Sequence, residues 1–263
     1  PNTGRNCRMN PKIISLAVFI VAYLLFVVFL KKRTIVAAGA SLLLVLLGAL
    51  SAKQAFFAVN WNVMGIFVGT LFLTDIFMES RVPAFLAEHI VNRTSSIAWA
   101  IIAICALTGF ISAFVENVAT VLIVAPIALA LAKRLKISPV NMLIAIAISS
   151  NLQGTATLIG DPPSMLLGGF ARMNFFDFFF YRGKPSIFFA VELGALASLP
   201  VLYYVFRKHT QKTVLVAEEK VLSWVPTIML TAMIVALALS SFFDTGFSFL
   251  AGIICMAFGL AAF

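Results

Sequence analysis

A short segment of glycine, proline and hydroxyl residues interrupts a long apolar run in the middle of the chain. Residues 154–164 read Gly-Thr-Ala-Thr-Leu-Ile-Gly-Asp-Pro-Pro-Ser and lie inside the apolar run 140–170. Glycine and proline both disfavour helix, so this segment predicts a helix that unwinds and restarts. At membrane depth such chain is tolerated only where it is buried in protein or lines a wet cavity. Secondary transporters bind cargo at such breaks, so the segment predicts an ion or substrate site.

The composition indicates that lipid is the solvent of this chain. Of its 263 residues, 62% are hydrophobic and 11% are charged, which leaves too little polar surface for a soluble globule. The net charge of +9 does not indicate a nucleic-acid partner, because the basic residues cluster at the ends of apolar runs. We therefore expect an all-α polytopic membrane protein that contacts the lipid bilayer of the plasma (inner) membrane.

The apolar runs predict the membrane segments. A span needs about 20 residues. Runs of suitable length cover residues 13–30, 34–50, 61–78, 97–132, 140–170, 187–206, 225–243 and 247 onward. Run 97–132 is too long for one helix, so we expect a helical hairpin with Glu116 and Asn117 at its midpoint. It is either re-entrant or a pair of short spans joined by an external turn, and spacing alone does not separate these alternatives.

Basic residues predict the orientation, because cytoplasmic loops carry an excess of Lys and Arg. Alternation of the spans places twelve on the cytoplasmic side: Lys31, Lys32, Arg33, Arg81, Arg93, Lys133, Arg134, Lys136, Arg207, Lys208, Lys212 and Lys220. The opposite side receives seven: Arg5, Arg8, Lys12, Lys53, Arg172, Arg182 and Lys184. This bias predicts an external N-terminus.

Two segments resemble the signature segments of the ion transporter superfamily. They are Glu-Asn-Val-Ala-Thr at residues 116–120, followed by Ala-Pro-Ile at 125–127, and the segment 154–164 with its Gly-Asp-Pro-Pro. That superfamily includes citrate and dicarboxylate transporters, the membrane component of the arsenite pump, and the P protein. Dicarboxylate members have Ser and Thr where this chain has Glu116 and Val118, so the tip is more similar to the arsenite pump and P protein branch.

The resemblance implies an inverted-repeat transporter in which each repeat has a re-entrant helical hairpin and a broken transmembrane helix. We expect residues 1–8 to be an upstream or non-native leader, because Met9 leads directly into the first span. The resemblance implies that 9–206 form the first repeat, with its hairpin at 97–132 and its broken helix at 140–170. Residues 207–224 are a cytoplasmic linker, and 225–263 begin a truncated second repeat. The resemblance also implies a homodimer of the full-length protein.

Helix ends at the tip and the break predict a mixed ion site. Helices that resume at Asn117 or Val118, and at Pro162, would point N-terminal amides at an anion. Carbonyls at the preceding helix ends, together with Asn151 and nearby hydroxyls such as Ser149, could hold a cation or hydronium. The predicted substrate and ion site comprises Glu116, Asn117, Thr120, Ser150, Asn151, Gly154, Thr155, Thr157, Gly160 and Asp161.

Acidic residues inside apolar runs are costly unless they are paired, protonated or hydrated. Glu116 and Asp161 are the candidates for ion coupling. Asp161 has an equally weighted structural interpretation as the N-cap of a helix that starts at Pro162. Asp75 is better explained as an interfacial carboxylate, and Glu192 as a packed polar pair rather than a pathway residue.

The function expected from these features is ion-coupled transport. We expect a proton-coupled permease for an anion or a metalloid oxyanion such as arsenite or antimonite. The alternatives are a sodium-coupled citrate or dicarboxylate transporter, a sodium/proton antiporter and a passive channel. An enzyme is not expected, because no metallopeptidase or nucleophile motif accompanies the two histidines. No cofactor beyond the coupling H⁺ or Na⁺ is expected, and the three scattered cysteines predict no metal site.

Overall fold

The computed structural model describes residues 10–94, 96–135, 138–208, 220–243 and 249–263, and most of these residues are helical. The chain divides into two compact units, Pro1–Asn60 and Trp61–Phe263. The predicted leader and most of the predicted linker 207–224 lie outside the described residues. Of the described helices, α1, α4 and α10 are long and apolar enough to span a membrane alone, and five further apolar helices are shorter. The fold is that of an all-α polytopic membrane protein.

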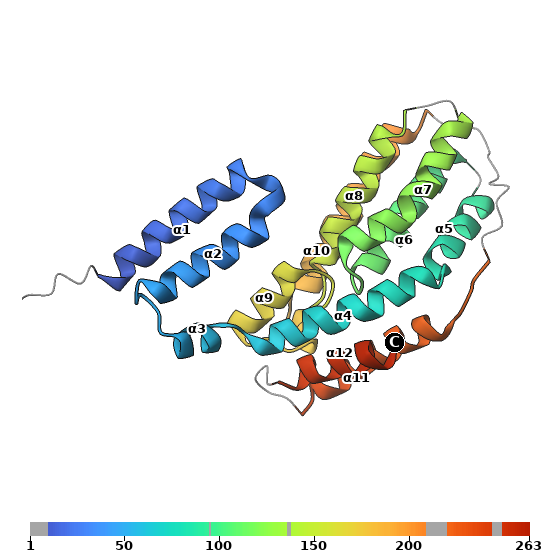
Figure 1. Cartoon of the computed structure of the whole chain (residues 1–263). Coiled ribbons are helices and arrows are strands. Elements are labelled where there is room, and N and C mark those ends of the chain that lie inside the picture. The colour runs from blue at the N-terminus through green and yellow to red at the C-terminus, as the bar shows by residue number, and fades with distance from the viewer. Residues whose placement is uncertain (1–9, 95, 136–137, 209–219, 244–248) are drawn as a thin grey trace, which may run out of the picture. The chain divides into compact units, whose positions relative to one another are not determined.

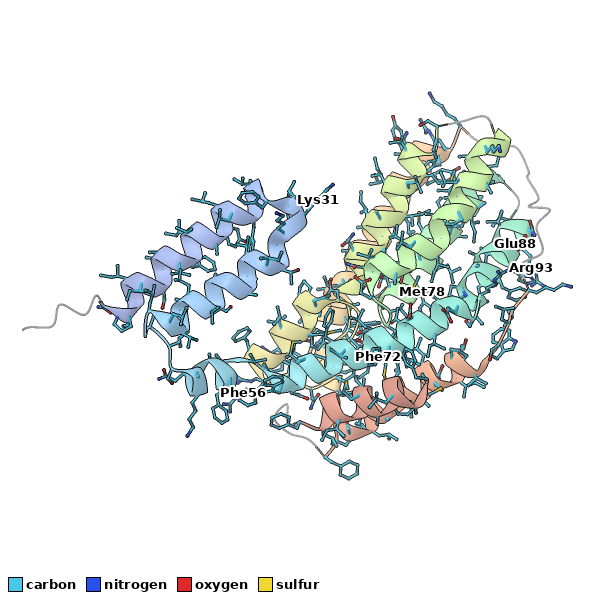
Figure 2. All side chains as sticks on the ribbon, in the orientation of Figure 1. Lys31, Phe56, Phe72, Met78, Glu88 and Arg93 are labelled. Atoms are coloured by element: carbon cyan, nitrogen blue, oxygen red, sulfur yellow. The ribbon has the colours of Figure 1, made fainter. Side chains whose placement is uncertain are left out.

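The smaller unit is an antiparallel helix pair followed by a short helix (Figure 1). It contains α1 (Pro11–Val28), the 3₁₀ turn η1 (Leu30–Lys32), α2 (Arg33–Leu46) and α3 (Ala52–Ala58). Helix α1 begins where Asn10 Oδ1 accepts a hydrogen bond from the Lys12 backbone N–H. Lys31 extends from the turn between α1 and α2 (Figure 2). Large apolar side chains such as Phe19 and Leu24 are exposed, as expected of helices that face lipid.

The larger unit contains the predicted hairpin and the predicted broken helix. Its helices are α4 (Trp61–Glu79), α5 (Val82–Arg93), α6 (Ile97–Ser112), α7 (Asn117–Leu135), α8 (Val140–Gly154), α9 (Pro162–Ala171), α10 (Ile187–Phe206), α11 (Val225–Ser240) and α12 (Leu250–Ala261). Helices α6 and α7 are the two arms predicted for residues 97–132. Helices α8 and α9 are the two halves predicted for residues 140–170. Each of the two segments thus contains two helices.

Two apolar cores stabilise the larger unit. One lies among α5, α6, α7 and α8, and its fully buried side chains include Ile101, Ile104, Val124, Leu131 and Ile146. The other surrounds α4 and includes Ile66, Leu73, Met165, Phe178 and Met233. Burial of a large apolar side chain contributes about 1.5–3 kcal/mol in water, and tight packing takes over this role in lipid. The hairpin is therefore packed tightly against α8.

Small residues let α4 and α12 approach closely (Figure 1). A Cβ added at Gly65 would lie 3.1 Å from Gly252 Cα, and one added at Gly259 would lie 2.6 Å from Gly69 O. Asn62 Oδ1 accepts a hydrogen bond from the Gly252 backbone N–H at 2.7 Å. Such close helix contacts are typical of membrane proteins. A helix of the predicted second repeat thus packs against a helix of the predicted first repeat.

Three local features differ from the hydropathy pattern. The short helices α3 and α5 were not expected, because neither is a continuous apolar run. Helix α5 buries only one face, which includes Val82, Ala87 and Val91. Residues 173–181, which connect two apolar runs, do not form a long helix. They form the 3₁₀ turn η2 (Phe176–Phe178) and strand β1 (Phe180–Tyr181), which pairs with β2 (Lys184–Pro185).

Candidate functional site

The break between α8 and α9 is irregular chain that is almost fully buried. Helix α8 ends at Gly154 and α9 begins at Pro162, and residues 156–161 between them are buried. The Thr155 hydroxyl donates to Leu152 O at 2.8 Å, and the Ala156 N–H donates to Gln153 O at 2.9 Å. These bonds satisfy carbonyls that the end of α8 leaves without helical partners. The chain is therefore unwound but held in one arrangement.

Asp161 is the N-cap of α9. Its Oδ1 accepts a hydrogen bond from the Ser164 backbone N–H at 3.0 Å, and its side chain is 3% exposed. The first two residues of α9, Pro162 and Pro163, have no N–H group. The capping interpretation of Asp161 is therefore confirmed. The start of α9 can contribute its dipole to a site, but two of the four amides that a helix start normally offers are missing.

Glu116 has the same relation to α7. Helix α6 ends at Ser112 and α7 begins at Asn117, one of the two positions expected. Glu116 Oε2 accepts a hydrogen bond from the Ala119 backbone N–H at 2.9 Å. The Thr120 hydroxyl is buried and donates to Glu116 O at 3.0 Å. Glu116 is only half-buried, and the first residues of α7 keep their N–H groups.

The hairpin tip and the break contact each other directly. Asn117 Nδ2 donates to Asn151 Oδ1 at 2.9 Å, and the Ser150 hydroxyl donates to Asn117 O at 3.0 Å. The Ser112 hydroxyl donates to Ser150 O at 2.9 Å and lies 2.9 Å from the Ser150 hydroxyl. The Thr157 hydroxyl donates to Ala113 O. These bonds join residues more than thirty positions apart, so they fix the tip against the broken helix.

Two glycines allow the close approach, to different degrees. A Cβ at Gly160 would lie 2.8 Å from Ala113 O and 2.9 Å from Ser112 O, and it would also overlap Gly154 O. A Cβ at Gly154 would have ordinary contacts, with the Ser112 hydroxyl at 3.4 Å and Asp161 Cβ at 3.6 Å. Glycine is therefore sterically required at residue 160 and not at residue 154.

The structure brings most of the predicted site residues together. Asn117, Ser150, Asn151, Gly154, Thr157, Gly160 and Asp161 meet at the junction of tip and break. Glu116 directly precedes α7 and Thr120 lies on its first turn, whereas the Thr155 hydroxyl bonds within its own helix end. Ser149 lies elsewhere, in a cavity between α6, α8 and α10. Asp75 is exposed on α4.

Sequence reasoning missed two residues of this junction. Ser112 binds Ser150, and the Ser164 hydroxyl lies 3.4 Å from Thr155 O. The last-turn position of Ser112, just before the hairpin tip, was the available signal. Four helix ends meet here, the C-terminal ends of α6 and α8 and the N-terminal ends of α7 and α9. Their partial charges can bind ions of either sign. The hairpin tip thus touches the middle of residues 140–171.

Comparisons with known proteins agree with this architecture. A family model described as citrate transporter matches residues 23–262. An uncharacterized transporter of Mycobacterium tuberculosis is 27% identical over 196 residues, which are 73% of this chain and 45% of that protein. The 46 kDa membrane protein of Mycobacterium leprae is 29% identical over the same shares. The human P protein is 28% identical over 145 residues, 55% of this chain and 17% of that protein.

The chain thus spans less than half the length of the mycobacterial relatives. The family match covers the four helices of the junction, α6 to α9, and the helices α10 to α12 that follow them. It extends over most of the described residues of both compact units. The chain belongs to the citrate transporter family.

Proposed function

We propose that the protein containing this chain is a secondary active transporter in the plasma membrane. It moves an anion or a metalloid oxyanion, such as arsenite or antimonite, and couples this movement to protons. The observation that carries the proposal is the junction itself, where the buried residues 156–161 contact the hairpin tip. Membership in the citrate transporter family and a relative named as a transporter support the transport class over an enzyme.

The start of α7 is the proposed anion-binding element. Asn117 and Val118 supply backbone N–H groups at the positive end of the helix. The Asn117 side chain is held by Asn151, which fixes its orientation. Glu116 and Asp161 are the acids beside this position. Glu116, which is half-buried, is the proposed proton-titrating group, whereas Asp161 is the buried cap of α9. The chain provides one half of the site, and a second repeat completes it in a homodimeric transporter that works by alternating access.

A second candidate is sodium-coupled transport of citrate or a dicarboxylate. The description of the matching family favours citrate as the anion. The carbonyls of Ser112, Ala113 and Gly154, which converge near Gly160, are oxygen ligands of the kind that cations prefer. In this case sodium rather than a proton occupies the junction.

Flux measurements on the complete gene product in proteoliposomes test these proposals. Arsenite, antimonite, citrate and succinate are supplied separately under an imposed proton gradient, an imposed sodium gradient, or neither. Accumulation of one cargo above its equilibrium level under the proton gradient supports the first proposal. Accumulation of citrate or succinate under sodium alone supports the second. Equilibration without accumulation under every gradient indicates a channel and contradicts both.

A further inference from the structure

A second polar pair lies outside the junction, in a cavity between α6, α8 and α10. The cavity has a volume of about 290 Å³ and a largely apolar lining that includes Phe110, Phe188 and Leu199. Gln153 of α8 and Glu192 of α10 meet in it, and Gln153 Nε2 donates to Glu192 Oε2 at 3.2 Å. Glu192 therefore has a polar partner, and it lies outside the junction.

The hydrogen bonds of this pair are incomplete. Gln153 Oε1 is buried and has no hydrogen-bond partner among the described residues. An ionised carboxylate can only accept hydrogen bonds, so it cannot supply the missing donor. The pair then has one donor group, the Gln153 amide nitrogen, and several acceptors, which are Gln153 Oε1 and the two Glu192 carboxylate oxygens. A buried acceptor without a donor is unfavourable.

No basic side chain completes the pair. Among the described residues that line the cavity, none is Lys, Arg or His. From α6 the titratable group is Cys105, from α8 there is none, and from α10 there is Glu192 itself. The Ser198 hydroxyl donates to Ala195 O at 2.7 Å within its own helix. The cavity therefore lacks a positive partner for the carboxylate.

We propose that Glu192 and Gln153 form a proton-binding site. In the protonated state the Glu192 carboxyl group donates its O–H to Gln153 Oε1 and accepts from Gln153 Nε2, so both side chains pair reciprocally. A proton needs only these two groups, whereas Ca²⁺ and Mg²⁺ take six or more oxygen ligands. Binding of one proton therefore supplies the missing hydrogen-bond donor and also neutralises the Glu192 carboxylate.

This site is linked to the break through the backbone of α8. Gln153 immediately precedes Gly154, the last residue of the helix, and Gln153 O accepts the Ala156 N–H. A Cβ at Gly109 of α6 would lie 2.8 Å from Gln153 Cγ, so the Gln153 side chain packs closely against α6, the first arm of the hairpin. Loss of the proton leaves Gln153 Oε1 without a donor and favours movement of Glu192 toward water. The last turn of α8 then loses this support.

Chemical labelling tests the proton site independently of transport. Dicyclohexylcarbodiimide is apolar and reacts with protonated carboxyl groups. The acid proton moves to a carbodiimide nitrogen, the carboxyl oxygen bonds to the central carbon, and rearrangement leaves a stable N-acylurea. We expect Glu192 of the complete gene product in membranes to be modified at neutral pH, more slowly as the pH rises, and faster than the exposed Glu79. Mass spectrometry of the two peptides gives both rates. Equal rates at every pH would overturn the proposal.

Transport tests the link to coupling, which rests on the function proposed above. Glu192→Gln keeps the side-chain size but cannot bind a proton. Coupling between two linked sites is typically about 5–150-fold, and we expect the effect of an imposed proton gradient on flux to disappear in this variant. Downhill exchange of cargo without a gradient should persist, which shows that the variant folds.

The two failures are distinguishable. If the wild type shows no proton-driven flux, the proposed function is wrong, and labelling of Glu192 still decides whether the proton site exists. If the wild type and Glu192→Gln respond equally to the proton gradient, the coupling role of Glu192 is wrong while the proposed function stands.

Discussion

The starts of α7 and α9 are built alike but offer different chemistry. In each, an acid directly before the helix accepts the backbone N–H of the residue three positions later, Ala119 for Glu116 and Ser164 for Asp161. Asp161 is buried and is followed by two prolines, whereas Glu116 is half-buried and is followed by residues that keep their N–H groups. Both acids cap their helices, but only the α7 start keeps N–H groups in its first positions that can bind an anion. We infer that the α9 start is structural and the α7 start is functional.

The largest expected effect on stability is at Gly160, in the break just before α9. In Gly160→Ala the new methyl group meets three backbone carbonyls that have no room to move. Such overpacking should lower the free energy of unfolding by about 3 kcal/mol. Thermal unfolding in detergent measures the loss. Gly154→Ala is the matched control and should change the free energy by less than about 1 kcal/mol, because its Cβ has ordinary contacts. Equal effects of the two changes would show that the break is not rigidly packed.

The next effect is expected at Ser150, which joins the two regions. Ser150→Ala removes the donor to Asn117 O and the hydroxyl pair with Ser112. Leaving buried polar groups unpaired costs about 1–3 kcal/mol. The melting temperature should fall accordingly. Ser41→Ala removes an exposed hydroxyl that bonds only within α2, and it should change little. If Ser41→Ala is as damaging as Ser150→Ala, the junction is not a specific contact.

A smaller effect is expected from the cap of α9. Asp161→Ala removes the acceptor for the Ser164 N–H and should cost about 0.5–2 kcal/mol, as at other N-caps. Asp161→Asn keeps a good capping group and should retain most of the stability. Chemical unfolding of the two variants separates the effect of losing the cap from the effect of losing the charge. A larger loss in the Asn variant than in the Ala variant would contradict the capping role.

The smallest effect on stability is expected at Asn151. Its side chain is exposed and accepts from Asn117, so Asn151→Ala should cost about 0.5 kcal/mol. Cargo affinity should nevertheless fall, because Asn117 loses the partner that orients it. Binding measured by competition in proteoliposomes, beside the melting temperature, tests this split. A large loss of stability with unchanged affinity would make Asn151 structural.

Local signals were enough to predict where the helices stop. The length of the apolar run 97–132 predicted the hairpin, and the glycines and prolines of residues 154–164 predicted the break. Asp161 followed by proline predicted the start of α9, because capping and proline chemistry act within one turn. Contacts between distant segments were not predictable in this way. Ser112 meets Ser150 and Gln153 meets Glu192 only after the hairpin and α10 pack against α8. Helix α5 was missed because it buries one face and is not a continuous apolar run.

Proton-driven flux in the Glu116→Gln and Asp161→Asn variants of the complete gene product tests the central claim most directly. Both changes remove one negative charge and keep a side chain of similar size that can accept a hydrogen bond. If the α7 start is the functional one, Glu116→Gln abolishes accumulation under an imposed proton gradient while Asp161→Asn retains much of it. Loss of flux in Asp161→Asn with full activity in Glu116→Gln would contradict the account.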